Sequence, residues 1–132
     1  MEYQKERHKI EQSISKEVPP LNLHSLADSI GTILHNTNKK EVFRYGFCSD
    51  LMSDLLTTDI PQTVLITGLI TTQTIRTAHI AEIHCVIFVR NKVIDHTLID
   101  IAKELDINII RSEHTMFKVC GMLYKRGLKA IY

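Results

Sequence analysis

The chain has 132 residues, and its 16 lysines and arginines nearly balance 15 aspartates and glutamates, for a formal net charge of +1. This length fits one domain, which by surface scaling buries roughly two-thirds of the surface of the unfolded chain and needs no disulfide or metal for stability. A charge so close to zero gives no general attraction to nucleic acid or to an anionic membrane, and we expect neither as a partner.

The cysteines and the apolar runs bear on the compartment. Cys48, Cys85 and Cys120 are odd in number and form no CxxC motif, which favours a reducing environment. The first ten residues lack the apolar core of a signal peptide, and no run approaches the roughly 18 apolar residues of a membrane span. We therefore expect a soluble, cytoplasmic protein.

Residues 1–18 mix acidic and basic side chains densely, and only three aliphatic residues recur at a four-residue spacing. A stripe this thin indicates a solvated arm; the alternative is a helix that docks on a partner or on a second subunit. A Pro-Pro pair then stops any helix. We predict a charged arm over residues 1–20 and a single domain over residues 21–132.

The first elements of the domain are short. Asn22 has the side chain to cap a helix over residues 23–30, whose apolar residues share one face, and Gly31 ends it. Two β-branched or aromatic runs, residues 32–34 and 42–47, flank a polar stretch with turn chemistry. These runs predict a small hairpin.

The next predicted helix extends from Ser49 to Leu56. Serine is a favoured N-cap residue, and the leucines and the methionine that follow it fall on one face. Asp50 and Asp54 lie near the positive end of this helix, so we assign them to the helix dipole rather than to a catalytic acid pair.

From residue 63 onward, short apolar runs alternate with amphipathic segments of helical length, which is the pattern of βαβ units. The runs are rich in valine and isoleucine, as expected of parallel strands covered on both faces, and span residues 64–67, 85–89 and 107–110. The helices are predicted at residues 74–83, 97–105 and 114–126, the last ended by Gly127. Right-handed crossovers then give a three-layer α/β/α domain with a mainly parallel central sheet.

Ligands of open parallel sheets bind beyond the carboxyl ends of the strands, where loops meet helix N-termini. The sequence places hydroxyls, a glycine and arginines there, which are groups that hold phosphate. The predicted ligand-binding residues are Thr67, Gly68, Thr71, Thr72, Arg90, Arg111 and Ser112. The alternative is that the hydroxyls are ordinary helix caps and the arginines are solvated. Neither a dinucleotide fingerprint nor a P-loop is present to decide between the two.

Metal and thiol chemistry have less support in the sequence. The seven histidines form no HExxH motif, and His79 and His84 are five residues apart, so we predict no metal and no cofactor. Cys85 and Cys120 have the character of small buried residues, and Cys48 has no activating base beside it in sequence. We therefore assign the cysteines to packing.

One acid-base pair stands at a predicted strand end. Glu113 and His114 are neighbours there, and Ser112 is the nearby nucleophile. An enzyme built on these three residues is one hypothesis. Because no fuller catalytic set accompanies them, we expect a protein without catalytic activity.

Three segments in this order resemble the DRTGG domain family over about residues 21–131. They are SDLMSDLL from Ser49 to Leu56, the threonine-rich stretch after the first parallel strand, and INIIRSEHTMFKVCGMLYKRGLKAI near the C-terminus. Where the name-giving motif of the family is expected, the sequence reads KEVFRYG from Lys40 to Gly46, and only Gly46 matches it.

The resemblance implies a compact α/β module with the fold of the N-terminal domain of HPr kinase/phosphorylase. Domains of this family stand alone, or are attached to CBS domains in inorganic pyrophosphatases and to phosphate acetyltransferases. The resemblance also implies a regulatory role and dimeric assembly, and it brings no catalytic residues.

Taken together, these features predict a non-catalytic regulatory or ligand-sensing module that acts as a homodimer. Its ligand is expected to be a phosphorylated metabolite or a nucleotide, bound at the carboxyl ends of the parallel strands. The alternative is a purely structural module that dimerises or holds a protein partner and binds no small molecule.

Overall fold

The computed structural model describes residues 19–37 and 39–131, so the predicted charged arm lies outside the described residues except for its last two positions. The elements are, in chain order, β1 (Leu21–Asn22), α2 (Leu23–Ala27), β2 (Gly31–His35), β3 (Val42–Phe43), β4 (Tyr45–Cys48), α3 (Met52–Leu55), β5 (Thr63–Thr67), α4 (Thr72–Ile80), β6 (Cys85–Phe88), α5 (His96–Glu104), β7 (Asn108–Ser112), α6 (Met116–Lys125) and β8 (Lys129–Ala130). Among these helices, none has both the length and the apolar character needed to cross a membrane.

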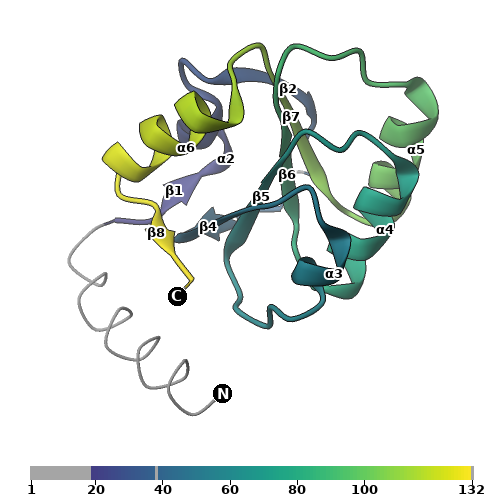
Figure 1. Ribbon diagram of the computed structural model, residues 1–132, viewed down its shortest axis with the longest axis horizontal. Coiled ribbons are helices and arrows are strands. Elements are labelled where there is room, and N and C mark those ends of the chain that lie inside the picture. Colours follow the sequence, from purple (N-terminus) through teal and green to yellow (C-terminus); the bar gives the residue numbers. More distant parts are fainter. Residues whose placement is uncertain (1–18, 38, 132) are drawn as a thin grey trace.

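A six-stranded sheet forms the centre of the domain, in the order β2-β7-β6-β5-β4-β8 (Figure 1). Each neighbouring pair from β7 to β8 is parallel, and only β2, at the other edge, is antiparallel to its neighbour. A second, two-stranded sheet pairs β1 with β3. The mainly parallel central sheet predicted from the apolar runs is therefore confirmed.

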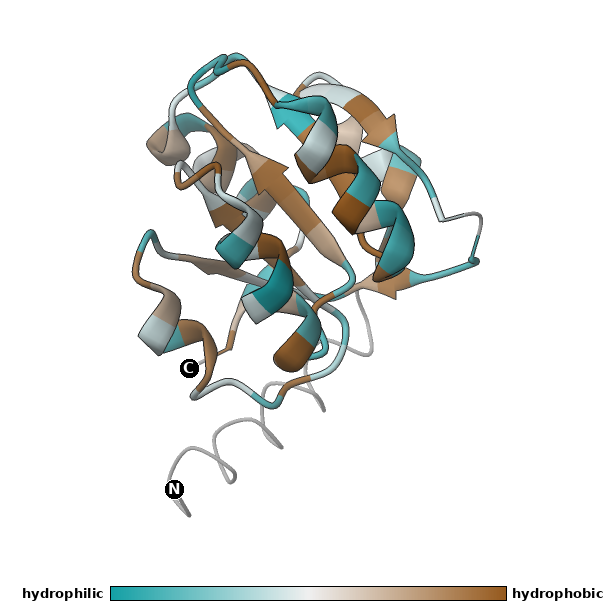
Figure 2. Cartoon of the chain, turned by 90° about the vertical axis from the view of Figure 1, so that its right-hand side faces the viewer, coloured by the Kyte–Doolittle hydropathy of each residue, from teal (hydrophilic) through white to brown (hydrophobic). Residues whose placement is uncertain are grey.

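Helices cover both faces of this sheet, which gives the predicted three layers. Helices α2 and α6 lie over one face and α3, α4 and α5 over the other (Figure 1). In Figure 2 the strands are mostly brown, and the helices that cover them carry teal residues on their outward sides. Two hydrophobic cores result, one on each side of the sheet.

Strands β5, β6 and β7 are the three predicted apolar runs, shifted by at most two residues. Successive residues point to opposite faces of a strand, so each strand contributes to both cores. Leu65 and Phe88 pack under α4 and α5, whereas Ile66 and Ile87 pack under α2 and α6. All four are at most 2% exposed, which explains why a continuous apolar run was needed.

The predicted hairpin is wrong. Strand β2 pairs antiparallel with β7, with Gly31 opposite Ser112, while β3 pairs with β1 and β4 lies between β5 and β8. The polar stretch after β2 does allow the chain to turn, but turn chemistry says nothing about which strand becomes the neighbour.

The predicted cap at Ser49 is also wrong. Helix α3 begins at Met52, and its N-cap residue Leu51 makes no side-chain capping bond. Ser49 Oγ instead accepts a hydrogen bond from the Leu51 backbone N–H at 2.9 Å, within the extended segment before the helix. By contrast, Asn22 caps α2 as predicted, accepting from the Ser25 N–H at 2.8 Å.

Candidate ligand site at the carboxyl edge of the sheet

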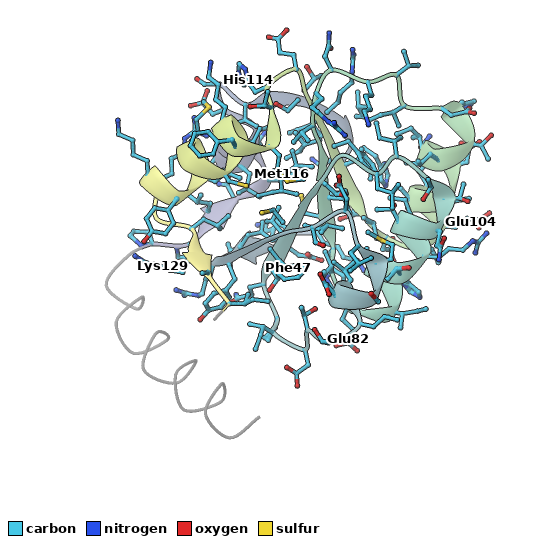
Figure 3. The ribbon with its side chains drawn as sticks, viewed as in Figure 1. Phe47, Glu82, Glu104, His114, Met116 and Lys129 are labelled. Carbon is cyan, nitrogen blue, oxygen red and sulfur yellow. The ribbon has the colours of Figure 1, made fainter. Side chains whose placement is uncertain are left out.

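The carboxyl ends of β5, β6 and β7 meet at one edge because the three strands are parallel neighbours. Thr67 ends β5, and Gly68 follows it; Arg90 comes two residues after β6, and Arg111 lies near the end of β7. His114, just after β7, is labelled at this edge in Figure 3, and Glu82, before β6, is labelled at the opposite edge. We call the two regions the carboxyl edge and the amino edge.

Asp50 holds the end of β5. Its Oδ1 accepts a hydrogen bond from Thr67 Oγ1 at 2.9 Å and another from the Gly68 N–H at 2.7 Å. The Gly68 bond lowers the pKa of the Asp50 carboxyl most, and the Thr67 bond and the charges of Arg90 and Lys92 lower it further, against the opposing effect of burial. The assignment of Asp50 to a helix dipole is therefore wrong, because the carboxylate binds the neighbouring strand end instead.

This contact changes what Thr67 and Gly68 offer to a ligand. The two donors that were predicted to face an anion face a carboxylate of the same chain. Thr67 Oγ1 also accepts from the Leu69 N–H at 3.1 Å, so the hydroxyl fixes the loop that leaves the strand. The pair therefore shapes the edge of the candidate site.

Arg90 and Asn91 form the turn after β6, and both have a positive φ, of 69° and 51°. This turn is held by backbone bonds to the segment after β7: the Arg90 N–H donates to His114 O and the Asn91 N–H to Ser112 O, both at 2.8 Å. The Arg90 guanidinium lies against Gly68, where a Cβ atom would stand 2.5 Å from Nη2. A glycine at position 68 leaves room for this guanidinium.

Arg111 supports the same turn from β7. Its Nε donates to the Lys92 carbonyl at 3.0 Å, and its Nη2 donates to Asn91 Oδ1 at 2.7 Å. Arg90 thus belongs to the turn at residues 90–92, and Arg111 supports this turn from the neighbouring strand. The Arg90 guanidinium lies against Gly68, and neither arginine is part of the lining of the hollow described next.

The Ser112 side chain is turned into the interior of the protein. This side chain is buried, its hydroxyl donates to the Ile30 carbonyl at 2.7 Å, and it accepts from the His114 N–H at 3.1 Å. The structure therefore directs the Ser112 hydroxyl to Ile30 and His114 and not to the side chains of the other predicted residues. The same bonds leave the hypothetical Ser112-Glu113-His114 group without an accessible hydroxyl.

A hollow of about 520 Å³ lies between the start of α4 and the start of α5, and we call it the strand-end pocket. Its lining comprises Gly68, Leu69, Ile70, Thr71, Thr72, Lys92, Val93, Asp95, Thr97 and Leu98. Of the seven predicted residues, Gly68, Thr71 and Thr72 line it. Both helices are nine residues long, and their N-termini bring backbone N–H groups and positive dipole ends to the hollow.

The capping residues are partly used within the protein. Thr71 Oγ1 accepts from the Thr74 N–H at 3.2 Å, so Thr71 is an ordinary N-cap, as the alternative interpretation held for the hydroxyls. Asp95 caps α5 by accepting from the Thr97 N–H at 3.2 Å. Thr72 lies exposed in the first turn of α4.

Lys92 is the site residue that the sequence interpretation missed. Its Nζ donates to the Gly68 carbonyl at 2.8 Å. The Lys92 side chain therefore extends from the loop after β6 to the loop after β5, and both loops line the pocket. Lys92 stands two residues after Arg90, and extending the predicted rim along that loop would have included it. With two helix N-termini beside it, this cation favours an anionic ligand.

A larger hollow of about 1200 Å³ lies at the amino edge. Its lining has both signs of charge, including the pairs His84–Glu41, at 3.1 Å, and Lys39–Asp106, at 3.2 Å. The start of the KEVFRYG segment lies here. In the described part of the chain, no three His, Cys, Asp or Glu side chains are grouped so that they could hold a metal ion.

Comparison with known proteins supports the architecture. No family model and no curated protein matches the chain. The fold is similar to a crystal structure of the CBS and DRTGG domains of the regulatory region of a Clostridium perfringens pyrophosphatase, complexed with its activator, diadenosine tetraphosphate. The TM-score is 0.68 at 16% sequence identity, and the match covers 84% of this chain and 49% of the other. The chain thus spans about half the length of that neighbour, and the likeness supports a DRTGG-like fold.

Proposed function

We propose that this domain is a regulatory, ligand-sensing module that binds a phosphorylated small molecule in the strand-end pocket and catalyses no reaction. The observation that carries the proposal is the position of Lys92, whose ammonium lies beside a hollow that two helix N-termini also approach. Its volume of about 520 Å³ is within the range of small-molecule sites.

The chemistry of the pocket favours phosphate over other anions. An ammonium has three donors, and within the described residues the Gly68 carbonyl takes one of them. The remaining donors, the helix N-termini and the exposed Thr72 hydroxyl match an anion with several acceptor oxygens. The apolar side chains of Ile70 and Val93, which line the same hollow, suit the rest of the molecule.

The structural neighbour favours a nucleotide as the rest of that molecule. That protein is a regulatory region, and its activator is a dinucleoside tetraphosphate. We therefore propose a nucleotide for this chain. In this proposal Arg111 does not bind the ligand but holds the turn that positions Lys92, and the Arg90 guanidinium lies behind Gly68 at the rim of the pocket.

Calorimetric titration and thermal shift with diadenosine tetraphosphate, ATP and inorganic phosphate test the proposal. We expect saturable binding of at least one probe, with affinity at least roughly fivefold weaker in Lys92→Ala, as for the loss of a charged hydrogen bond. Lys118→Ala is the matched control, since this exposed lysine of α6 loses the same charge away from the pocket. Absence of binding at millimolar concentrations, or an affinity that Lys92→Ala leaves unchanged, would contradict the proposal.

A protein-interaction module is the second candidate, because α6 exposes aromatic side chains. Phe117 is 90% exposed and Tyr124 is 69% exposed, and Gly121 between them has open space where a side chain would be. We propose that this stripe mediates homodimerisation. Light scattering after size exclusion should give a dimer mass for the wild type and a monomer mass for Phe117→Ser; a wild-type monomer at high micromolar concentration would refute the dimer.

A further inference from the structure

Two cysteines from distant parts of the chain meet on the α6 side of the sheet. Cys48 is the last residue of β4, and it lies in register with Ile66, whose side chain belongs to the core under α6. Cys120 lies in α6 and packs against the same core. The side chain of Cys48 therefore points towards the helix that carries Cys120.

The two thiols are neighbours, because β4 and α6 pack together and both side chains face the same core. Burial, and then the charge of Cys48 and its side-chain interaction with Cys120, raise the pKa of Cys120 to about 12. Their proximity was not expected from the sequence, which assigned both cysteines to packing.

The two sulfurs differ in their access to solvent. Cys48 is exposed, whereas Cys120 is half-buried against the core. An oxidant in solution can therefore reach Cys48 first. The neighbouring thiol, Cys120, approaches Cys48 from the protein side. This is the arrangement of an attacking cysteine and a resolving cysteine.

We propose that Cys48 and Cys120 are a reversible redox pair that closes to a disulfide between β4 and α6 in the presence of a peroxide. The Cys48 sulfur, as thiolate, attacks one peroxide oxygen; the O–O bond breaks, and after protonation Cys48 carries a sulfenic acid and one water or alcohol leaves. The Cys120 sulfur then displaces the hydroxyl from Cys48 and releases its own proton, so that a second molecule of water forms. Two thiols are oxidised and one peroxide is reduced.

The geometry required for closure is specific. An S–S bond is roughly 2 Å long and its two Cα atoms stand roughly 4.4–6.8 Å apart, so it forms only between residues of directly packed elements, as β4 and α6 are. Cys85, the third cysteine, cannot take part. It is fully buried in β6, and burial raises the pKa of its thiol, so it is the internal control.

The test is oxidation of the full chain with one equivalent of hydrogen peroxide, followed by intact mass, thiol count and peptide mapping. We expect the protein to lose the mass of two hydrogens, one free thiol to remain, and a Cys48–Cys120 linked peptide to appear. Dithiothreitol should restore all three thiols. The oxidised monomer should melt roughly 5–15 °C higher, because the bond closes a long loop.

Single substitutions distinguish this pair from general oxidation. Cys48→Ser and Cys120→Ser should each abolish the loss of two hydrogens, and Cys120→Ser should instead gain one oxygen at Cys48. Cys85→Ala should form the disulfide as the wild type does. The proposal is overturned if the wild type only gains oxygen, if its disulfides join two chains, or if Cys85 is oxidised as readily as Cys48.

Discussion

At the carboxyl edge of the sheet, charged side chains bind loops and strand ends from distant parts of the chain, whereas the charged side chains around the wide hollow of the amino edge form two separate pairs. Asp50 joins the end of β4 to the end of β5, and Arg111 joins β7 to the turn after β6. Across the larger hollow, Lys39 and Asp106 form one pair whose side chains are 55% and 60% exposed.

This difference shows that the larger hollow is not the better prepared site. An exposed ion pair contributes little to stability and can rearrange, because water competes for both partners. Groups held by several bonds are already in position when a ligand arrives, so less ordering is needed on binding. The smaller strand-end pocket therefore has the better organised surroundings.

The largest expected change in the free energy of unfolding comes from adding one methyl group at a glycine of the carboxyl edge. Two glycines are compared, to test how tightly this edge is packed. At Gly31 a Cβ atom would overlap the backbone carbonyl oxygen of Arg111, so Gly31→Ala must push β2 away from β7. We expect a loss of about 2–4 kcal/mol in the free energy of unfolding, measured by urea denaturation.

Gly68→Ala is the matched control for that substitution. Its Cβ would meet the end of the flexible Arg90 side chain, which can move aside, so we expect a loss of less than about 1 kcal/mol. Equal losses at the two glycines would show that the pairing of β2 with β7 is not the rigid contact described here.

The next effect concerns the carboxylate that ties two strand ends together. Asp50→Ala removes the acceptor of the Thr67 and Gly68 donors, and we expect a loss of about 1–2 kcal/mol, reduced by the partial exposure of this site. Asp54→Ala is the control in the same segment, with one weaker bond from Ser49 Oγ at 3.3 Å. A larger loss at Asp54 than at Asp50 would favour the helix assignment made from the sequence.

The same carboxylate predicts a pH dependence. The pKa of Asp50 is lowered in the folded protein, so its contribution to stability is present above the unfolded pKa of about 4 and is lost as the pH falls through the lowered folded value. The difference in unfolding free energy between the wild type and Asp50→Asn should therefore be constant between about pH 5 and pH 7 and should shrink below about pH 4. A difference that grows on acidification would contradict this account.

The smallest effect is expected at the amino edge. Lys39→Ala and Asp106→Asn should each change the unfolding free energy by less than about 0.5 kcal/mol, because the pair is exposed and asparagine tolerates the positive φ of 55° at position 106. The change in unfolding free energy of the double variant should differ by even less from the sum of the two single changes. Coupling of more than about 1 kcal/mol in this cycle would mean that the amino edge is as well organised as the carboxyl edge.

The parts of the fold that the sequence predicted correctly depend on local patterns. Consecutive apolar residues marked β5, β6 and β7, since both faces of these strands had to be covered. The cap at Asn22 was predicted for the same kind of reason, because the side chain bonds a backbone group three residues away.

The errors arose where the partner of a residue is distant in sequence. Residues 32–34 and 42–47 have the composition of strands. Composition does not show that β2 pairs with β7, which lies far from it in the sequence. Asp50 is of a residue type that is common at helix starts, and it precedes a helix. Only the parallel arrangement of β4 and β5 brings Thr67 within reach of its carboxylate.

The sequence by itself determined the three-layer architecture and the edge at which a ligand site was to be sought, because the spacing of apolar residues decides which faces must be buried. Only the tertiary structure decided which polar groups remain available there. Asp50 engages Thr67 and Gly68, Ser112 turns inward to Ile30, and Lys92 reaches the pocket. Hydrogen bonds join atoms that the folded chain brings close, whatever their separation in the sequence.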